Sequence, residues 1–198
     1  FGVILLATIG GQLQEVTFPS PAEQQMALRT TADWVVRPRL RKIPGIAEVF
    51  ISVTTLDAQL SRILEPRAAS PLRRLRAIET LTRAGIPVHV NVAPVIPFIN
   101  EPEIERILEA AARAGAVKSH YTVLRLPWEV SPLFEQWLAA HFPERAQRVL
   151  NRVRDMRDGK NYDARFGDRM KGTGTWAALV RQRFDKASAK FALDGKRP

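Results

Sequence analysis

Residues 88–96 read VHVNVAPVI, and this stretch decides the fold. Val88, Val90 and Val92 alternate with His89, Asn91 and Ala93, which predicts a β-strand that buries one apolar face. A glycine and a proline, Gly85 and Pro87, stand just before it and mark the end of whatever element precedes the strand.

Upstream, EVFISVTT at residues 48–55 is a short β-branched and aromatic run, typical of a strand buried on both faces. Asp57 is placed to cap a short helix that contains Leu60, Ile63 and Leu64. A longer helix is expected to start at Ser70–Pro71, because proline is tolerated where no amide donor is needed.

Downstream, the same alternation of strand and helix repeats. Asn100 and Glu103 have the spacing of a capping box at the start of a helix that Gly115 ends. A third strand is expected at residues 120–126, before Pro127. Strands joined by helices of this length pair in parallel through right-handed crossovers. The predicted fold class is α/β, either an open sheet or part of a (β/α) barrel, with the helices near Ser70 and Asn100 on one face.

After Pro127 the pattern becomes helical. Helices are expected from Ser131, from Pro143 and over residues 176–191, with an irregular glycine-containing loop at residues 160–175. This part is also basic, since residues 144–198 hold fifteen Lys and Arg against seven Asp and Glu, a net charge of +8 out of +10 for the chain. Such a field attracts nucleic acid without sequence specificity, and a set of solvated helix faces is the alternative.

The 198 residues contain no cysteine, which excludes disulfides, cysteine nucleophiles and thiolate-bound clusters within this chain. His89, His120 and His141 lack the spacing of metal ligands and are interpreted as structural or surface residues. The apolar start at residues 1–9 is too short to cross a bilayer and lacks the basic segment of a signal peptide. A cytoplasmic protein is therefore expected.

Three stretches in order resemble the spore photoproduct lyase-like branch of the radical S-adenosylmethionine (AdoMet) superfamily, whose members are often described as DNA repair photolyase-like. They are SVTTLDAQLSRILEPRAASPLRRLRAI at residues 52–78, AGIPVHVNVAPVIPFIN at 84–100 and VLRLP at 123–127. The resemblance continues through residues 133–174, so that it covers roughly three quarters of the chain.

The resemblance implies a partial (β/α)₆ barrel in which a [4Fe–4S] cluster binds and reduces AdoMet for radical chemistry. The family holds that cluster on a C-x₃-C-x₂-C triad after its first strand, and this chain has no counterpart of the strand or the triad. The three expected strands would be the fourth to sixth of the barrel. We therefore expect the later half of the cofactor site, no cluster and no catalytic residue in this chain.

The resemblance also implies site residues, position by position. Ser52 and Thr54 would contact the AdoMet ribose and carboxylate, although polar strand residues satisfied by their neighbours are the alternative. The end of the next strand would pack against adenine, and the last strand would bring an arginine to an anionic substrate or to the AdoMet carboxylate, unless it pairs with a helix glutamate. These residues are Pro94, Val95 and Ile96 for adenine and Arg125 for the anion.

Four further cations are candidate substrate contacts. Arg67 belongs to the EPR element of this branch, residues 65–67, and Arg165, Arg169 and Lys171 flank glycines in the basic loop, a composition suited to backbone phosphates. Phe166 and Trp176 are placed to stack on a base, or to belong to the core.

The first fifty residues resemble a different family. GVILLATIGG at residues 2–11 and LRTTADWVVRPRLRKIPGIAEVF at 28–50 are similar to the porter domain of heavy-metal efflux pumps of the resistance-nodulation-division class. The expected organisation is thus a porter-like segment at 1–50, a half barrel at 51–127 and a helical basic extension at 128–198. A basic nucleic-acid-binding module and a fragment of an efflux pump are the alternative functions.

Overall fold

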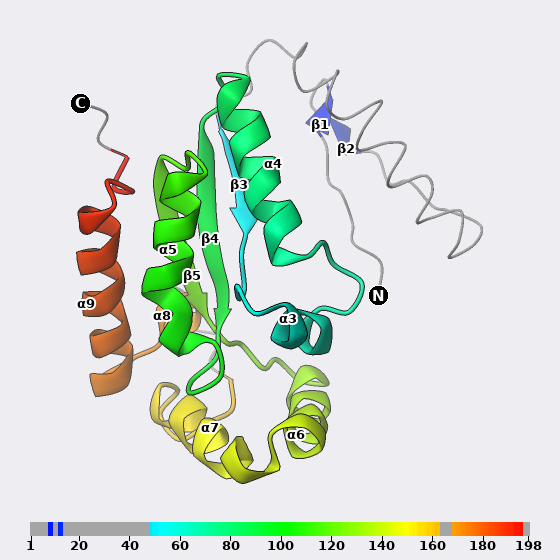
Figure 1. Ribbon diagram of the computed structural model, residues 1–198. Coiled ribbons are helices and arrows are strands. Elements are labelled where there is room, and N and C mark those ends of the chain that lie inside the picture. Colours follow the sequence, from blue (N-terminus) through cyan, green and yellow to red (C-terminus); the bar gives the residue numbers. More distant parts are fainter. Residues whose placement is uncertain (1–7, 10–11, 14–47, 163–167, 196–198) are drawn as a thin grey trace. The chain divides into compact units, whose positions relative to one another are not determined.

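A parallel three-stranded sheet forms the centre of residues 47–198 (Figure 1). Its strands are β3 (Val49–Ser52), β4 (Val88–Val95) and β5 (Lys118–Val123), and β4 lies between the other two. The computed structural model describes residues 8–9, 12–13, 48–162 and 168–195. The predicted α/β class and the parallel, sequential strand order are confirmed.

The chain divides into two compact units, residues 1–46 and 47–198. The described residues of the first unit form an antiparallel pair, β1 (Thr8–Ile9) with β2 (Gln12–Leu13). Most of the porter-like segment at 1–50 lies outside the described residues. The sheet and all helices named below belong to the second unit.

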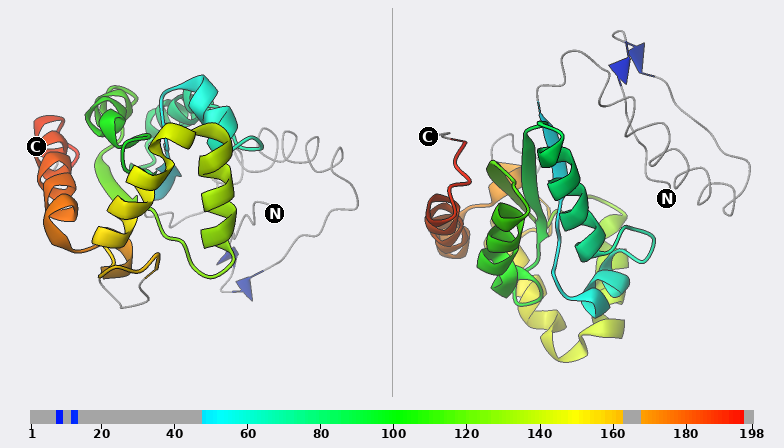
Figure 2. Two further views of the ribbon diagram at one scale, coloured as in Figure 1. Left: turned by 90° about the horizontal axis from the view of Figure 1, so that it is seen from below. Right: turned by 45° about the horizontal axis from the view of Figure 1, so that its top comes forward.

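Two crossover helices cover the same face of the sheet. They are α4 (Pro71–Arg83) and α5 (Ile104–Arg113), which lie side by side over that face in Figures 1 and 2. Their buried residues, such as Ile78, Ile107 and Leu108, join the valines of β4 in one hydrophobic core. The prediction of both helices on one face is thereby confirmed, as right-handed crossovers between sequential strands require.

Helices α3 (Ala58–Leu64), α6 (Val130–His141) and α7 (Pro143–Asp155) lie at the carboxyl end of the strands (Figure 1). The short helix α3 begins as predicted, because the Asp57 carboxylate accepts hydrogen bonds from the amides of Gln59 and Leu60. Helices α6 and α7 follow the sheet, and α9 (Gly174–Lys190) packs beside α5.

Two sequence predictions about local structure are wrong. The capping box at Asn100 does not form, because the Asn100 side chain bonds elsewhere and a 3-10 turn, Glu101–Glu103, precedes α5. The segment at 160–175, expected to be irregular, contains a short helix, α8 (Asp168–Lys171). No helix within the described residues is long and apolar enough to cross a membrane.

The two edges of the sheet differ. Along β5, the Ser119 amide donates to the Leu193 carbonyl at 2.9 Å, and Lys118 forms an antiparallel bridge with Asp194, so the end of the chain covers this edge. The outer edge of β3 pairs with no strand among the described residues of this unit. An uncovered edge of a parallel sheet presents amides and carbonyls that can accept another strand.

Candidate functional site

The carboxyl ends of β3 and β4 are joined by one buried amide. Asn100 is 1% exposed, and its Oδ1 accepts from the Ile96 amide at 2.7 Å. Its Nδ2 donates to the Thr54 and Pro94 carbonyls, both at 2.8 Å. The Asn100 side chain thus replaces the missing ladder bonds where the two strands separate, and it fixes the end of the sheet where α/β proteins usually place their sites.

A second polar group at this end connects β3 to helices α3 and α4. The Thr54 hydroxyl lies 2.8 Å from the Glu65 carboxylate and 3.1 Å from the Ala93 carbonyl. Arg74 donates to the same carboxylate at 2.8 Å and to the Ser52 carbonyl at 2.9 Å. Thr54 is therefore buried and bonded internally, the alternative that the sequence had left open, and the EPR glutamate serves as its partner.

The third group, Glu103, ties the loop after β3 to the start of α5. Its carboxylate accepts from the Thr55 hydroxyl at 2.6 Å and from the Leu56 amide at 2.9 Å. Glu103 is thus occupied by a loop 47 or 48 residues away in the sequence, which explains why it does not return to the Asn100 amide as a capping box would require.

The face of the sheet opposite α4 and α5 carries a polar row. Ser52 lies beside Asn91, and Asn91 lies beside His120, in the register of the three strands. Residues in register on parallel strands point to the same face, which here is opposite to the valines of β4. Ser52 is exposed, and the buried Oδ1 of Asn91 has no hydrogen-bond partner among the described residues. An acceptor left without a partner at a buried position is costly unless a ligand or an ordered water completes it.

Two residues nearer the amino end of β4, on the same face, His89 continues the row into a chain of polar side chains. The Nε2 atom of His89 lies 3.1 Å from the Glu48 carboxylate, and His89 Nδ1 lies 3.4 Å from His120 Nε2. Burial lowers the pKa of His120, and the neighbouring His89 and Lys118 lower it further. His120 therefore favours its neutral form, whose ring nitrogens can exchange hydrogen bonds with a ligand or with His89.

Arg125 follows β5 and reaches the segment after α7. Its Nη2 donates to the Tyr162 hydroxyl at 3.1 Å, while its Nη1 lies 3.6 Å from the Met170 sulfur. Its buried Nε atom has no partner, and the described residues place no carboxylate in an ion pair with it. The helix-glutamate alternative for Arg125 is thus absent from this part of the chain, and the guanidinium keeps capacity for an anion.

The remaining predicted cofactor residues have different surroundings. Val95 and Ile96 are 0% and 1% exposed and belong to the core, so their side chains contact protein rather than an open site. Pro94 is half-buried, and its carbonyl is bonded to Asn100. The Val95 and Ile96 carbonyls also accept hydrogen bonds within the chain, so the half-buried Pro94 ring is the part of this stretch that remains as a contact for a ligand.

The predicted substrate cations do not form a single cluster. Arg67 is exposed on the loop between α3 and α4, whereas Arg169 and Lys171 lie half-buried on α8. Arg165 and Phe166 lie outside the described residues, and Trp176 is half-buried against the core.

Lys171 packs inward instead of facing solvent. Its Nζ donates to the Tyr121 carbonyl at 2.9 Å and lies 3.2 Å from the centre of the Tyr121 ring. The ring and the carbonyl stabilise the ammonium, but burial outweighs them and lowers the pKa of Lys171 to about 8. Lys171 therefore fixes α8 to β5, and its charge is poorly placed for a substrate.

We predict that Lys171 makes the free energy of unfolding of the chain rise with pH in the alkaline range. Its pKa is lower in the folded chain, about 8 against an ordinary 10.5, so the unfolded chain binds more protons between these values and stability rises with pH. Between pH 7 and 9.5 the free energy of unfolding of the wild-type chain should rise more than that of Lys171→Met, by on the order of 1 kcal/mol. Urea unfolding followed by circular dichroism measures it. Lys186→Met, at an exposed lysine of α9, serves as the control and should keep the full rise.

Sequence reasoning missed Asn91 and Arg157. Asn91 had a signal, since it stands opposite the valines in the alternation that predicts β4. Arg157, which is 0% exposed, had none, because an arginine in a basic helical region is indistinguishable by pattern from its solvated neighbours. The described residues contain no group of three or more His, Cys, Asp or Glu side chains suited to a metal ion.

Comparison with known proteins gives relatives without an assigned function. The chain is 32% identical over 118 residues to an uncharacterized protein of Mycobacterium tuberculosis and equally to one of Mycobacterium bovis. The match covers 54% of this chain and 35% of each relative, so the chain spans about a third of the length of the curated relatives it matches. No protein-family model and no solved structure matches the chain.

Proposed function

We propose that residues 50–198 are the later half of a radical AdoMet enzyme of the spore photoproduct lyase-like branch. In this proposal β3, β4 and β5 are the fourth to sixth strands of a partial (β/α)₆ barrel. The parallel sequential order, the two crossover helices on one face and the unpaired edge of β3 are what such a half barrel requires. The preceding strands would add at the edge of β3 and enclose the polar row.

The observation that carries the proposal is the buried Asn91 Oδ1, which has no partner among the described residues and lies between Ser52 and His120 on the face opposite α4 and α5. AdoMet offers ribose hydroxyls and an ammonium as donors, which fit the Asn91 acceptor and the Ser52 hydroxyl. Its carboxylate fits the Arg125 guanidinium, which has an unpaired Nε. When bound, AdoMet would supply a sulfonium whose reductive cleavage starts radical chemistry; Ser52, Asn91 and Arg125 would bind and orient it.

The iron–sulfur cluster does not fit this chain. A [4Fe–4S] cluster is held by cysteine thiolates, and the sequence has none. We therefore assign Ser52, Asn91 and Arg125 to AdoMet binding alone. Radical chemistry would need a longer protein that supplies the cluster, and that reaction is part of the proposal.

The proposal predicts that the chain binds AdoMet weakly through Asn91. Asn91→Ala should lower the affinity about tenfold, because one hydrogen bond to a buried acceptor contributes about 1 kcal/mol or somewhat more. Equilibrium dialysis of the full chain with methyl-labelled AdoMet measures the effect, and Asn151→Ala, an exposed asparagine on α7, is the matched control.

Arg125 provides a second comparison. Arg125→Gln should weaken binding of AdoMet but leave methylthioadenosine, which lacks the carboxylate, unchanged. Absence of AdoMet binding to the full chain at millimolar concentration, or equal affinities of the Asn91 and Asn151 variants, would contradict the proposal.

A second function, binding of nucleic acid by the basic C-terminal part, is favoured by the charge of its helices. On α7 alone, Arg145 and Arg148 are exposed and have no acidic partner among the described residues. Exposed unpaired arginines of this kind neutralise phosphates, and their affinity falls steeply with salt.

A further inference from the structure

A phenylalanine after β4 is held against the arginines of α7. The Arg148 guanidinium carbon lies 4.0 Å from the centre of the Phe98 ring, and that of Arg152 lies 5.9 Å away. Arg145 donates from Nη1 to the Phe98 carbonyl at 3.3 Å. We call Phe98, Arg145, Arg148 and Arg152 the arginine platform.

The backbone at Phe98 is strained. Its φ is 61°, in the left-handed region that bulky residues rarely adopt. Strain of this kind persists where surrounding contacts impose it, and it gathers at ligand-binding positions. Here it turns the ring under Arg148, so that the guanidinium is fixed before any ligand arrives and loses less freedom on binding.

The charges of the platform oppose the stability of its own helix. Arg145, Arg148 and Arg152 follow at spacings of three and four, which places like charges next to one another on one face of α7. Arg145 also lies in the first turn, where the helix dipole disfavours a cation. Two acids lie nearby: Asp155 pairs with Arg152 at 3.3 Å, and Glu144 forms no ion pair with Arg148. A local arrangement that costs stability and is compensated only in part, here by Asp155, is a mark of function.

We propose that the arginine platform binds the phosphodiester backbone of a nucleic acid. The three arginines span seven residues of helix, about 10 Å, which matches about three successive phosphates along one strand of a duplex. The platform recognises phosphates and no base edge, so its binding is indifferent to sequence. Its phenylalanine lies three residues after the end of β4, so the platform joins the segment after that strand to α7. This inference rests on the nucleic-acid binding proposed above and locates it.

The test compares two double variants of the full chain by fluorescence anisotropy with a labelled 20-base-pair duplex. Arg145→Gln/Arg148→Gln should weaken binding at least tenfold and reduce the slope of log affinity against log salt by about 2. Arg73→Gln/Arg76→Gln removes the same charge at the same spacing from exposed positions of α4, and should change the affinity less than threefold. Phe98→Leu keeps every charge, so it should weaken binding several-fold with an unchanged slope.

The outcomes separate the two proposals. If the wild-type chain does not bind the duplex at low salt, nucleic-acid binding itself is refuted and the platform with it. If it binds and the two double variants are weakened equally, general charge explains the binding and only the platform is refuted. Equally tight binding of the wild-type chain to vesicles of phosphatidylglycerol would also overturn it, because the surface would then not select nucleic acid. Circular dichroism of each variant confirms that it is folded.

Discussion

Replacing Arg157 by alanine should lower the free energy of unfolding by about 3–5 kcal/mol, one of the two largest losses we expect from a single substitution in this chain. Arg157 is fully buried, just after the end of α7. Its Nη1 donates to the Asp168 carbonyl at 2.9 Å, and its Nη2 donates to the Leu124 carbonyl at 3.1 Å. One side chain therefore joins α7, α8 and the end of β5.

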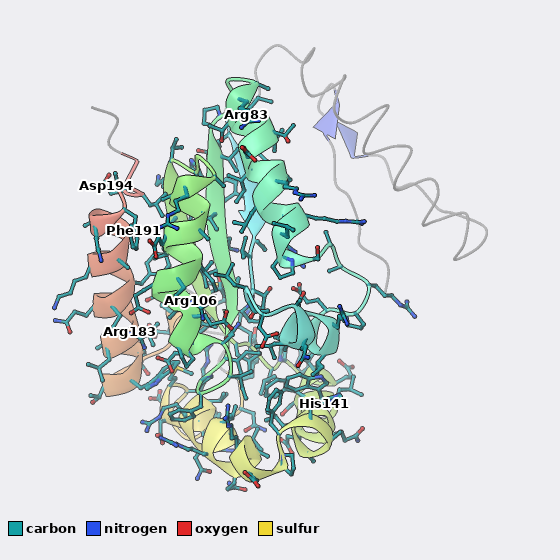
Figure 3. All side chains as sticks on the ribbon, in the orientation of Figure 1. Arg83, Arg106, His141, Arg183, Phe191 and Asp194 are labelled. Atoms are coloured by element: carbon teal, nitrogen blue, oxygen red, sulfur yellow. The ribbon has the colours of Figure 1, made fainter. Side chains whose placement is uncertain are left out.

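Two costs add in this substitution. Alanine leaves a cavity of nearly the whole arginine side chain, and it leaves both carbonyls without their donor. Arg157→Met separates the costs, because it fills most of the volume and donates nothing, so it should lose less than Arg157→Ala and still fall below the wild type. Urea unfolding measures all three chains, with Arg106→Ala on the exposed side of α5, labelled in Figure 3, as the control. An Arg157→Ala chain within 0.5 kcal/mol of that control would falsify the assignment.

The sheet was predictable because its signals are local. The alternation at residues 88–96 and the glycines at 85 and 115, which adopt φ of 77° and 97°, sufficed to place β4 and the ends of α4 and α5. Gly115 has a second requirement, since a Cβ there would lie 2.7 Å from the Thr82 side chain. The sequence thus predicts the order of the elements. The predicted element boundaries are wrong where tertiary contacts replace the hydrogen bonds of the β-ladder.

The polar contacts were not predictable, since their partners are distant in sequence. Asn100 and Glu103 have the spacing of a capping box, yet they bond to residues 54–56, which reach them only after the crossover through α4 has formed. Likewise Arg183 of α9 pairs with Glu101 and Glu105, and Figure 3 shows it beside α5. The Arg183 guanidinium lowers the pKa of Glu105, but the distance between the two residues in the sequence does not predict that they form a pair.

The candidate site was predictable in position and not in composition. The carboxyl end of the strands follows from topology alone. Which side chains remain available there depends on which ones the fold uses for itself. Thr54 and Ile96 are used by the fold, whereas Asn91 and Arg125 keep unpaired atoms. Whether a side chain is free to bind a ligand depends on how it packs, and the residue type alone does not predict this.

The second large effect is expected at Asn100, where alanine should cost about 2–4 kcal/mol of unfolding free energy. The Asn100 amide satisfies one donor and two acceptors of the backbone, and each buried group left without its partner costs about 1–3 kcal/mol. The effects on the three groups are not additive, because water that enters the smaller side chain's space can bond to some of them.

Asn100→Asp tests the geometry more sharply than alanine does. The carboxylate can still accept from the Ile96 amide, but it cannot donate, and it places a charge against the Thr54 and Pro94 carbonyls. This variant should therefore be at least as unstable as Asn100→Ala near pH 7 and should recover partly as acid protonates the carboxyl. Both variants should also weaken AdoMet binding, since β3 and β4 carry Ser52 and Asn91 to the site in a register that the amide fixes. Urea unfolding and the dialysis assay are the measurements, and Asn151→Ala is the control for both. If Asn100→Asp proves as stable as that control, the amide does not hold the strand ends together.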